Sequence, residues 1–138
     1  MQKIFFRYWS QPLLIASTIF YLSSIPGDEI HIPVFPFSDK LCHALAYGAL
    51  SFFLTRALTR KERLHPGIKN YRSVFVWAVV FGIFYGISDE FHQSFVPGRS
   101  VDAGDLFADG IGSLMGSLIV VPYRKFSLEI EKRLGRKT

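Results

Sequence analysis

The stretch from Ser88 to Gly116 reads SDEFHQSFVPGRSVDAGDLFADGIGSLMG, and the rest of the chain is organised around it. It combines carboxylates, one histidine and one arginine with small residues at every fourth position, namely Gly104, Ala108, Gly112 and Gly116. Small residues at this spacing share one helix face and let membrane helices approach closely. We therefore expect a tight helix contact beside a group of ionisable side chains.

The composition indicates a membrane protein of one domain. The 138 residues are 49% hydrophobic, include 14 Phe and have a mean hydropathy of +0.24. An ordinary soluble domain is less apolar than this. We expect a single domain over residues 1–138. Its one cysteine, Cys42, cannot form a disulfide within the chain and is expected to be a small packing residue.

Four segments without Asp, Glu, Lys or Arg predict membrane-spanning helices: residues 8–27, 41–55, 73–88 and 110–123. Only the first reaches the ~20 residues that a spanning helix needs. The three shorter segments approach this length when the arginine at one end of each is included, because its guanidinium group can snorkel to the membrane surface. The sequence therefore predicts an all-α integral membrane protein, a four-helix transmembrane bundle. A cleaved signal peptide is the other interpretation of the N-terminal segment, but no small-x-small cleavage site follows Leu22.

The charged residues divide between the two predicted sides of the membrane. Lys40 and Arg99 are the two cations on one side, where eight carboxylates lie: Asp28, Glu29, Asp39, Asp89, Glu90, Asp102, Asp105 and Asp109. The other 14 of the 16 Lys and Arg residues belong to the opposite side. Because cytoplasmic segments are enriched in cations, we expect a multi-pass protein with both termini in the cytoplasm. This split accounts for the net charge of +5 without a nucleic-acid partner, and none is predicted.

Two further segments are predicted to lie at the membrane surface. Residues 26–38 contain three prolines between apolar residues, which excludes a helix and favours a segment that lies on the membrane or caps the bundle. Near the end of the chain, apolar residues recur at helical spacing among Lys and Arg: Tyr123, Phe126, Ile130 and Leu134. This pattern predicts a short C-terminal interfacial helix.

A polar stripe is predicted on the helix that begins at Ser38 or Asp39, either of which can cap the free amides of its first turn. The stripe consists of residues four apart: Asp39, His43, Tyr47 and Ser51. One interpretation makes His43 a general base held by the carboxylate four residues away. The other makes it a polar residue that packs against a neighbouring helix.

The next two helices are expected to touch. Gly82 and Gly86 are four residues apart, and we expect them to face Gly112 and Gly116 of the last helix. The loop between these helices contains Val96–Arg99, with a proline followed by a glycine, which is typical of a type II turn. Such a turn would direct the arginine back toward the bundle.

The eight carboxylates exceed the two cations on their side, so some must be protonated, solvated or matched by a bound cation. One interpretation is a structural network of ion pairs. The chain has no HExxH motif and no paired Cys and His spacing, so no metal site and no cofactor are predicted. Arg99 offers a planar donor fork suited to a phosphate or carboxylate, and the alternative is an ion pair with Glu90 or Asp102.

These motifs resemble the VanZ-like family of small bacterial membrane proteins. The resemblance rests on DKxxHxxxY at 39–47, DExxQxFxPGR at 89–99 and DLxxDxxGxxxG at 105–116, and it covers residues 38–117. Asp109 stands where much of the family is expected to have Asn. The family is named for a protein that gives low-level resistance to teicoplanin, a glycopeptide antibiotic. The resemblance implies a protein of the bacterial inner membrane. A contribution to glycopeptide resistance is one function that the family suggests, but membership alone does not make a protein a resistance factor.

The predicted function is to bind an anionic or amphiphilic small molecule, envelope-related or lipid-linked, in an outward-facing polar and acidic pocket, with membrane lipids as further partners. Ten residues form the predicted binding site: Asp39, Lys40, His43, Tyr47, Asp89, Glu90, Gln93, Arg99, Asp105 and Asp109. The first alternative is a membrane-embedded enzyme that modifies a lipid-linked or cell-wall precursor with His43 and the acidic cluster. The second is a structural or partner-binding module. No catalytic residue and no oligomeric state are assigned.

Overall fold

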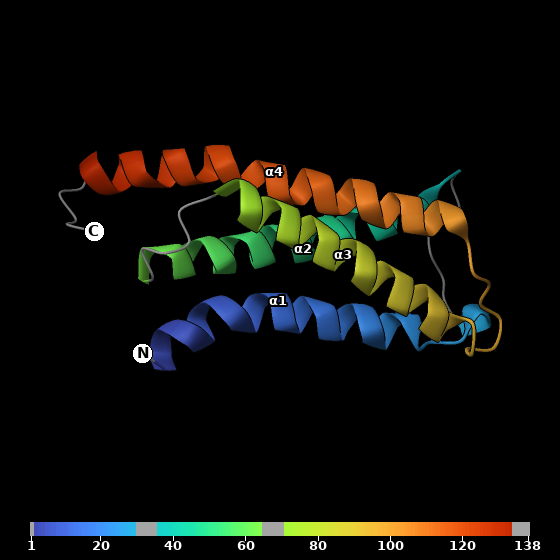
Figure 1. Cartoon of the computed structure of the whole chain (residues 1–138). Helices are drawn as coiled ribbons and strands as arrows, with labels where there is room; N and C mark the ends of the chain where they lie inside the picture. Colours follow the sequence, from blue (N-terminus) through green and yellow to red (C-terminus); the bar gives the residue numbers. More distant parts are fainter. Residues whose placement is uncertain (1, 30–35, 65–70, 134–138) are drawn as a thin grey trace.

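The computed structural model consists of helices joined by short connections (Figure 1). It describes residues 2–29, 36–64 and 71–133, and no strand occurs in these ranges. The elements are α1 (Gln2–Ser23), the short 3-10 helix η1 (Gly27–Glu29), α2 (Ser38–Leu64), α3 (Tyr71–Gln93) and α4 (Ala103–Arg133). The predicted all-α class is confirmed. Residues 30–35, in the middle of the predicted surface segment 26–38, lie outside the described residues.

Three helices are long and apolar enough to cross a membrane: Ser38–Thr59 in α2, Arg72–Gln93 in α3 and Ala103–Val120 in α4. Large apolar side chains on their outer faces are exposed, as the side chains of Trp77, Phe84 and Phe107 show. An exposed apolar surface of this extent is typical of contact with lipid. The protein is therefore a helical membrane protein, and α1 is not among the helices of the described residues that meet both criteria.

Local signals in the sequence explain where the helices begin. α2 begins at Ser38, as predicted, with Asp39 in its first turn. α4 begins after Asp102, whose Oδ1 accepts a hydrogen bond from the amide of Gly104 at 2.7 Å. This is the contact of an N-cap residue, which satisfies an amide that has no partner within the helix.

The predicted separate C-terminal helix is wrong. α4 continues through Pro122 to Arg133 as one element, so the apolar and basic residues of this segment form its last turns. A proline removes one hydrogen bond of a helix, but flanking turns of good helix formers can continue across it. Leu134 lies outside the described residues.

The closest helix contact joins α2 and α4. A Cβ atom at Gly112 would overlap the carbonyl of Ala44, and one at Gly116 would overlap the carbonyl of Gly48. The prediction that Gly112 and Gly116 face α3 is therefore wrong. Their four-residue spacing does bring two membrane helices into main-chain contact, as expected of such a stripe, but the partner is α2.

The glycines of α3 meet α4 at a different face. A Cβ atom at Gly82 would overlap the side chain of Ser113, and one at Gly86 would come within 2.7 Å of an oxygen of Asp109. The predicted contact between α3 and α4 is therefore correct, with polar side chains of α4 in place of its glycines. Small residues on α3 leave the room that these buried polar groups occupy.

Helix α1 packs on the other side of α2 and α3. Ile19 of α1 is buried with Tyr47 and Leu50 of α2 in one apolar cluster. The hydroxyl of Tyr85 in α3 donates to the carbonyl of Ala16 at 2.7 Å. All four helices lie side by side, and α1 begins at the end of the bundle where α4 ends (Figure 1).

Candidate functional site

The loop between α3 and α4 contains the predicted turn at Val96–Arg99. The amide of Arg99 donates to the carbonyl of Val96 at 3.2 Å, and Gly98 has a φ of 72°. A type II turn needs a positive φ at its third residue, which glycine adopts without strain. The prediction of this turn is confirmed.

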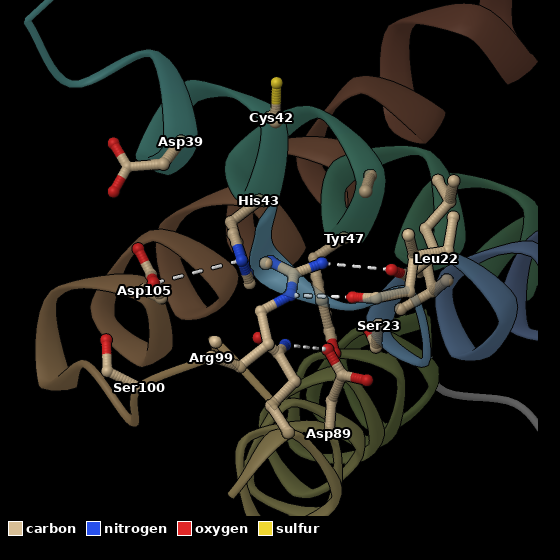
Figure 2. Close-up of a pocket in the computed structure, with 16 residues that line it drawn as sticks. Leu22, Ser23, Asp39, Cys42, His43, Tyr47, Asp89, Arg99, Ser100 and Asp105 are labelled. Carbon is tan, nitrogen blue, oxygen red and sulfur yellow. Dashed lines mark hydrogen bonds and ion pairs between the residues drawn. The ribbon is translucent and has the colours of Figure 1, made fainter. Parts of the chain in front are cut away.

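The turn directs Arg99 into the bundle, where it binds the end of α1 (Figure 2). Its Nε donates to the carbonyl of Ile25 at 3.2 Å, and its Nη2 donates to the carbonyl of Leu22 at 3.0 Å. A cation at these last carbonyls also interacts favourably with the helix dipole. Within the described residues Arg99 makes these contacts and no ion pair with Glu90 or Asp102.

A cavity of about 470 Å³ lies where α1 and α3 end and α2 and α4 begin. Side chains of Ile19, Leu22 and Ile25 form an apolar wall. Seven of the ten predicted binding residues also line the cavity: Asp39, His43, Tyr47, Asp89, Gln93, Arg99 and Asp105. The other three adjoin these residues without lining the cavity: Lys40, Glu90 and Asp109. The structure thus brings the whole predicted set together at one end of the bundle.

Lys40 joins the beginnings of α2 and α4. Its Nζ lies 2.6 Å from Asp102 Oδ2, 3.0 Å from Asp105 Oδ1 and 3.2 Å from Asp39 Oδ2. The Lys40 ammonium group, together with the amide of Gly104, holds the pKa of Asp102 below its ordinary value. One cation therefore neutralises part of a cluster of three carboxylates.

His43 is held by a carboxylate of another helix. Its Nδ1 lies 2.9 Å from Oδ1 of Asp109, a side chain of α4 with no exposed surface. Its Nε2 is directed toward Asp105, 4.0 Å from Oδ2 (Figure 2). The expected partner four residues away, Asp39, binds Lys40 instead. Asp109 thus makes this contact with His43 where an Asn was expected in much of the family.

On α3, two adjacent carboxylates have different surroundings. Asp89 is buried and accepts a hydrogen bond from Nε2 of Gln93 at 3.0 Å. Glu90 is 5% exposed, and its Oε2 accepts a hydrogen bond from the amide of Asp102 at 3.0 Å. Its Oε1 is buried and has no hydrogen-bond partner among the described residues.

A model of the family described as VanZ/LLP1 matches residues 3–124 of this chain. The chain belongs to the VanZ/LLP1 family. An uncharacterized protein of Schizosaccharomyces pombe is 29% identical over 119 residues, which are 85% of this chain and 67% of the relative. No solved structure matches the chain. The family match includes α1 and so extends beyond the part of the chain, residues 38–117, that carries the recognised motifs.

In this VanZ/LLP1 protein, α1 contributes a cavity wall that the sequence did not predict. The apolar residues of α1 belong to none of the recognised motifs and have the composition of a lipid-facing segment. Their role in the cavity therefore becomes apparent only from their position in the fold. Cys42 lines the cavity and is exposed, so the expectation that it is a buried packing residue is wrong. Cys42 directly precedes His43 of the polar stripe, and this position was the feature of the sequence that could have predicted its place in the cavity.

Proposed function

We propose that this VanZ/LLP1 protein binds an amphiphilic, anionic molecule of the cell envelope in the cavity. The observation that carries the proposal is the division of the cavity into an apolar wall from α1 and a polar wall from α2, α3 and the α3–α4 loop. A volume of about 470 Å³ is within the range of small-molecule sites. A lipid-like molecule has both an apolar and a polar part to match these walls.

Arg99 is the proposed partner of the anionic group. Arginine carries five N–H donors, and Arg99 uses two atoms, Nε and Nη2, on carbonyls. The remaining donors are available to a phosphate or carboxylate that enters the cavity. Lys40 already neutralises part of the nearby acidic cluster, which reduces the repulsion that such an anion would meet.

The apolar part is proposed to enter from the lipid side of α1. Leu22 lines the cavity and is also 51% exposed on the outer surface. Leu13, Leu14 and Tyr21 continue this exposed apolar surface along the helix. An acyl chain can therefore lie against α1 while its head group reaches Arg99.

The proposal includes a four-helix transmembrane arrangement in the bacterial inner membrane, with both termini in the cytoplasm. α1 has 22 residues, enough for about 33 Å of helix, and exposed apolar side chains support its contact with lipid. The distribution of cations supports the orientation. The single thiol gives a direct test: a membrane-impermeant maleimide should label Cys42 in intact cells. Labelling only after the cells are broken would contradict this orientation.

The binding proposal is tested by native mass spectrometry of the protein extracted in mild detergent. We expect a bound molecule of lipid-like mass. Ala46→Trp, which fills the cavity, should remove it, while Leu45→Trp, at a neighbouring side chain that is 65% exposed, should not. Folded protein with no bound molecule, or equal occupancy in both variants, would refute the proposal and leave a structural or partner-binding module.

A membrane-embedded enzyme is the second candidate function. The contact between His43 and Asp109 favours it, because a carboxylate on Nδ1 orients a histidine whose Nε2 acts as a general base. The test is incubation of the protein with lipid-linked cell-wall precursors, followed by mass spectrometry of the products. Turnover by the wild type that His43→Ala abolishes, while binding is kept, would establish the enzyme.

The proposal also extends to teicoplanin resistance, through the protein for which the family is named. Expression in a susceptible host should raise the inhibitory concentration of teicoplanin. Ala46→Trp should abolish the increase and Leu45→Trp should keep it. An increase that survives Ala46→Trp would separate resistance from the cavity.

A further inference from the structure

We propose that His43, Glu90 and Asp105 hold a divalent transition-metal ion, Zn²⁺ or Mn²⁺. The three side chains come from α2, α3 and α4, and each offers one ligand atom within 4.8 Å of the others. The proposal goes beyond the binding of an amphiphile and does not depend on it, since a metal ion can be measured without any lipid. Sequence spacing missed this set because its members belong to three different helices.

The geometry of the set suits one ion. His43 Nε2 lies 4.0 Å from Asp105 Oδ2, which is too long for a hydrogen bond. Metal–ligand bonds of ~2.0–2.2 Å place two ligands of one Zn²⁺ about 3–4 Å apart, which is the separation of His43 and Asp105. His43 and Asp105 both line the cavity, which gives the ion a path of entry.

The surroundings of His43 match those of a metal ligand. Its Nδ1 lies 2.9 Å from Asp109 Oδ1. In the neutral tautomer with the proton on Nδ1, this N–H donates to the carboxylate and Nε2 keeps its lone pair for an ion. Metal-bound histidines almost always have such a carboxylate or carbonyl behind them, which fixes the tautomer and raises the basicity of the ligating nitrogen. Asp109 is therefore a positioning residue for the ion.

The buried side chain of Glu90 supports the metal site independently of the contacts of His43. The side chain is 5% exposed and its Oε1 is buried without a hydrogen-bond partner among the described residues. Its Oε2 is already bound to the amide of Asp102. A buried carboxylate oxygen without a partner is costly, and a cation bound by Glu90 would remove that cost.

A second acidic set at this end of the bundle is already matched by a cation. Asp39, Asp102 and Asp105 also lie close enough to hold an ion, but Lys40 Nζ contacts all three within 3.2 Å. Asp105 uses Oδ1 for that contact, which leaves Oδ2 for the ion. The imidazole donor favours Zn²⁺ or Mn²⁺ over Mg²⁺ and Ca²⁺, which prefer ligand sets made of oxygen.

The test uses the full-length protein in detergent, freed of metals with EDTA and titrated calorimetrically with Zn²⁺, Mn²⁺, Mg²⁺ and Ca²⁺. We expect one ion per chain and affinities for Zn²⁺ or Mn²⁺ at least about tenfold above those for Mg²⁺ and Ca²⁺. Glu90→Gln, which keeps the size of the side chain, should weaken binding at least about tenfold, and Asp109→Asn about 10–100-fold. Asp28→Asn is the matched control, an exposed carboxylate at the same end of the bundle.

Pulsed electron paramagnetic resonance of bound Mn²⁺ gives a readout that a structural role would not produce. The wild type should show coupling to a directly bound nitrogen, and His43→Gln should abolish that coupling. Three outcomes would overturn the proposal: no binding to the wild type, a loss of affinity in Asp39→Asn as large as that in Glu90→Gln, or Mn²⁺ without a nitrogen ligand. If Glu90→Gln raises the melting temperature and no metal binds, Glu90 is a protonated carboxyl and not a ligand.

Discussion

Replacement of Gly116 by alanine tests the main-chain contact between α2 and α4. A Cβ atom at this position would overlap the carbonyl group of Gly48. Because the overlapped atoms belong to the backbone, no side-chain rotation relieves the clash, and the two helices must separate. Overpacking of this kind costs about 1–3 kcal/mol. It outweighs the ~0.5–1 kcal/mol that alanine gains over glycine within a helix.

Gly110→Ala is the matched control on the same helix. No atom lies within 4 Å of the position that its Cβ would take, so only the gain in helix propensity remains. The two alanine variants should therefore change stability in opposite directions. Thermal unfolding in detergent, followed by circular dichroism, measures both. Equal melting temperatures for Gly116→Ala and Gly110→Ala would refute the close approach of α2 and α4.

Three further results are expected. Lys40 depresses the pKa of Asp102, so their contact stabilises the fold above the ordinary carboxyl pKa of 3.8, and this contribution is lost as the pH falls further. The melting temperature of Asp102→Asn should therefore fall less between pH 5 and pH 2 than that of the wild type. The same pH profile in both proteins would contradict the pairing. Folded Arg99→Lys protein should no longer carry the bound molecule of lipid-like mass, because a lysine cannot contact two carbonyls and an anion at once. Full occupancy in this variant would show that Arg99 is not the partner of the anionic group. Tyr85→Phe removes the hydrogen bond to Ala16 and should destabilise the protein by about 1 kcal/mol, whereas no change in unfolding would mean that α1 is held by apolar contacts alone.

The combination of Arg99 and the proposed metal ion would explain an otherwise contradictory site. The cavity carries more carboxylates than cations, yet the proposed ligand is anionic. A divalent ion at His43 and Glu90 would offset part of that negative charge and offer a second anchor for a phosphate. Lipid occupancy measured with and without added Zn²⁺ would show whether the two sites cooperate.

Short-range features of this protein could be predicted from its sequence. The start of α2 at Ser38 and the turn at Val96–Arg99 each depend on a few adjacent residues, whose dihedral angles and hydrogen bonds are local. The side chains that gather around the cavity were also predictable, since stripes of period four and residues at helix ends converge at one end of a bundle. The three long apolar helices were also predicted, together with an N-terminal one that is not among the candidate spans of the described residues.

The pairing between helices was decided only by the tertiary structure. The stripe on α2 suggested Asp39 as the partner of His43, but the nearest carboxylate is Asp109 of α4. The glycines of α4 were expected to face α3, but they face α2. Spacing along one helix determines which of its residues share a face, but not which neighbour that face meets. That choice depends on how all four helices pack at once, and it brings His43, Glu90 and Asp105 together from separate segments of the chain.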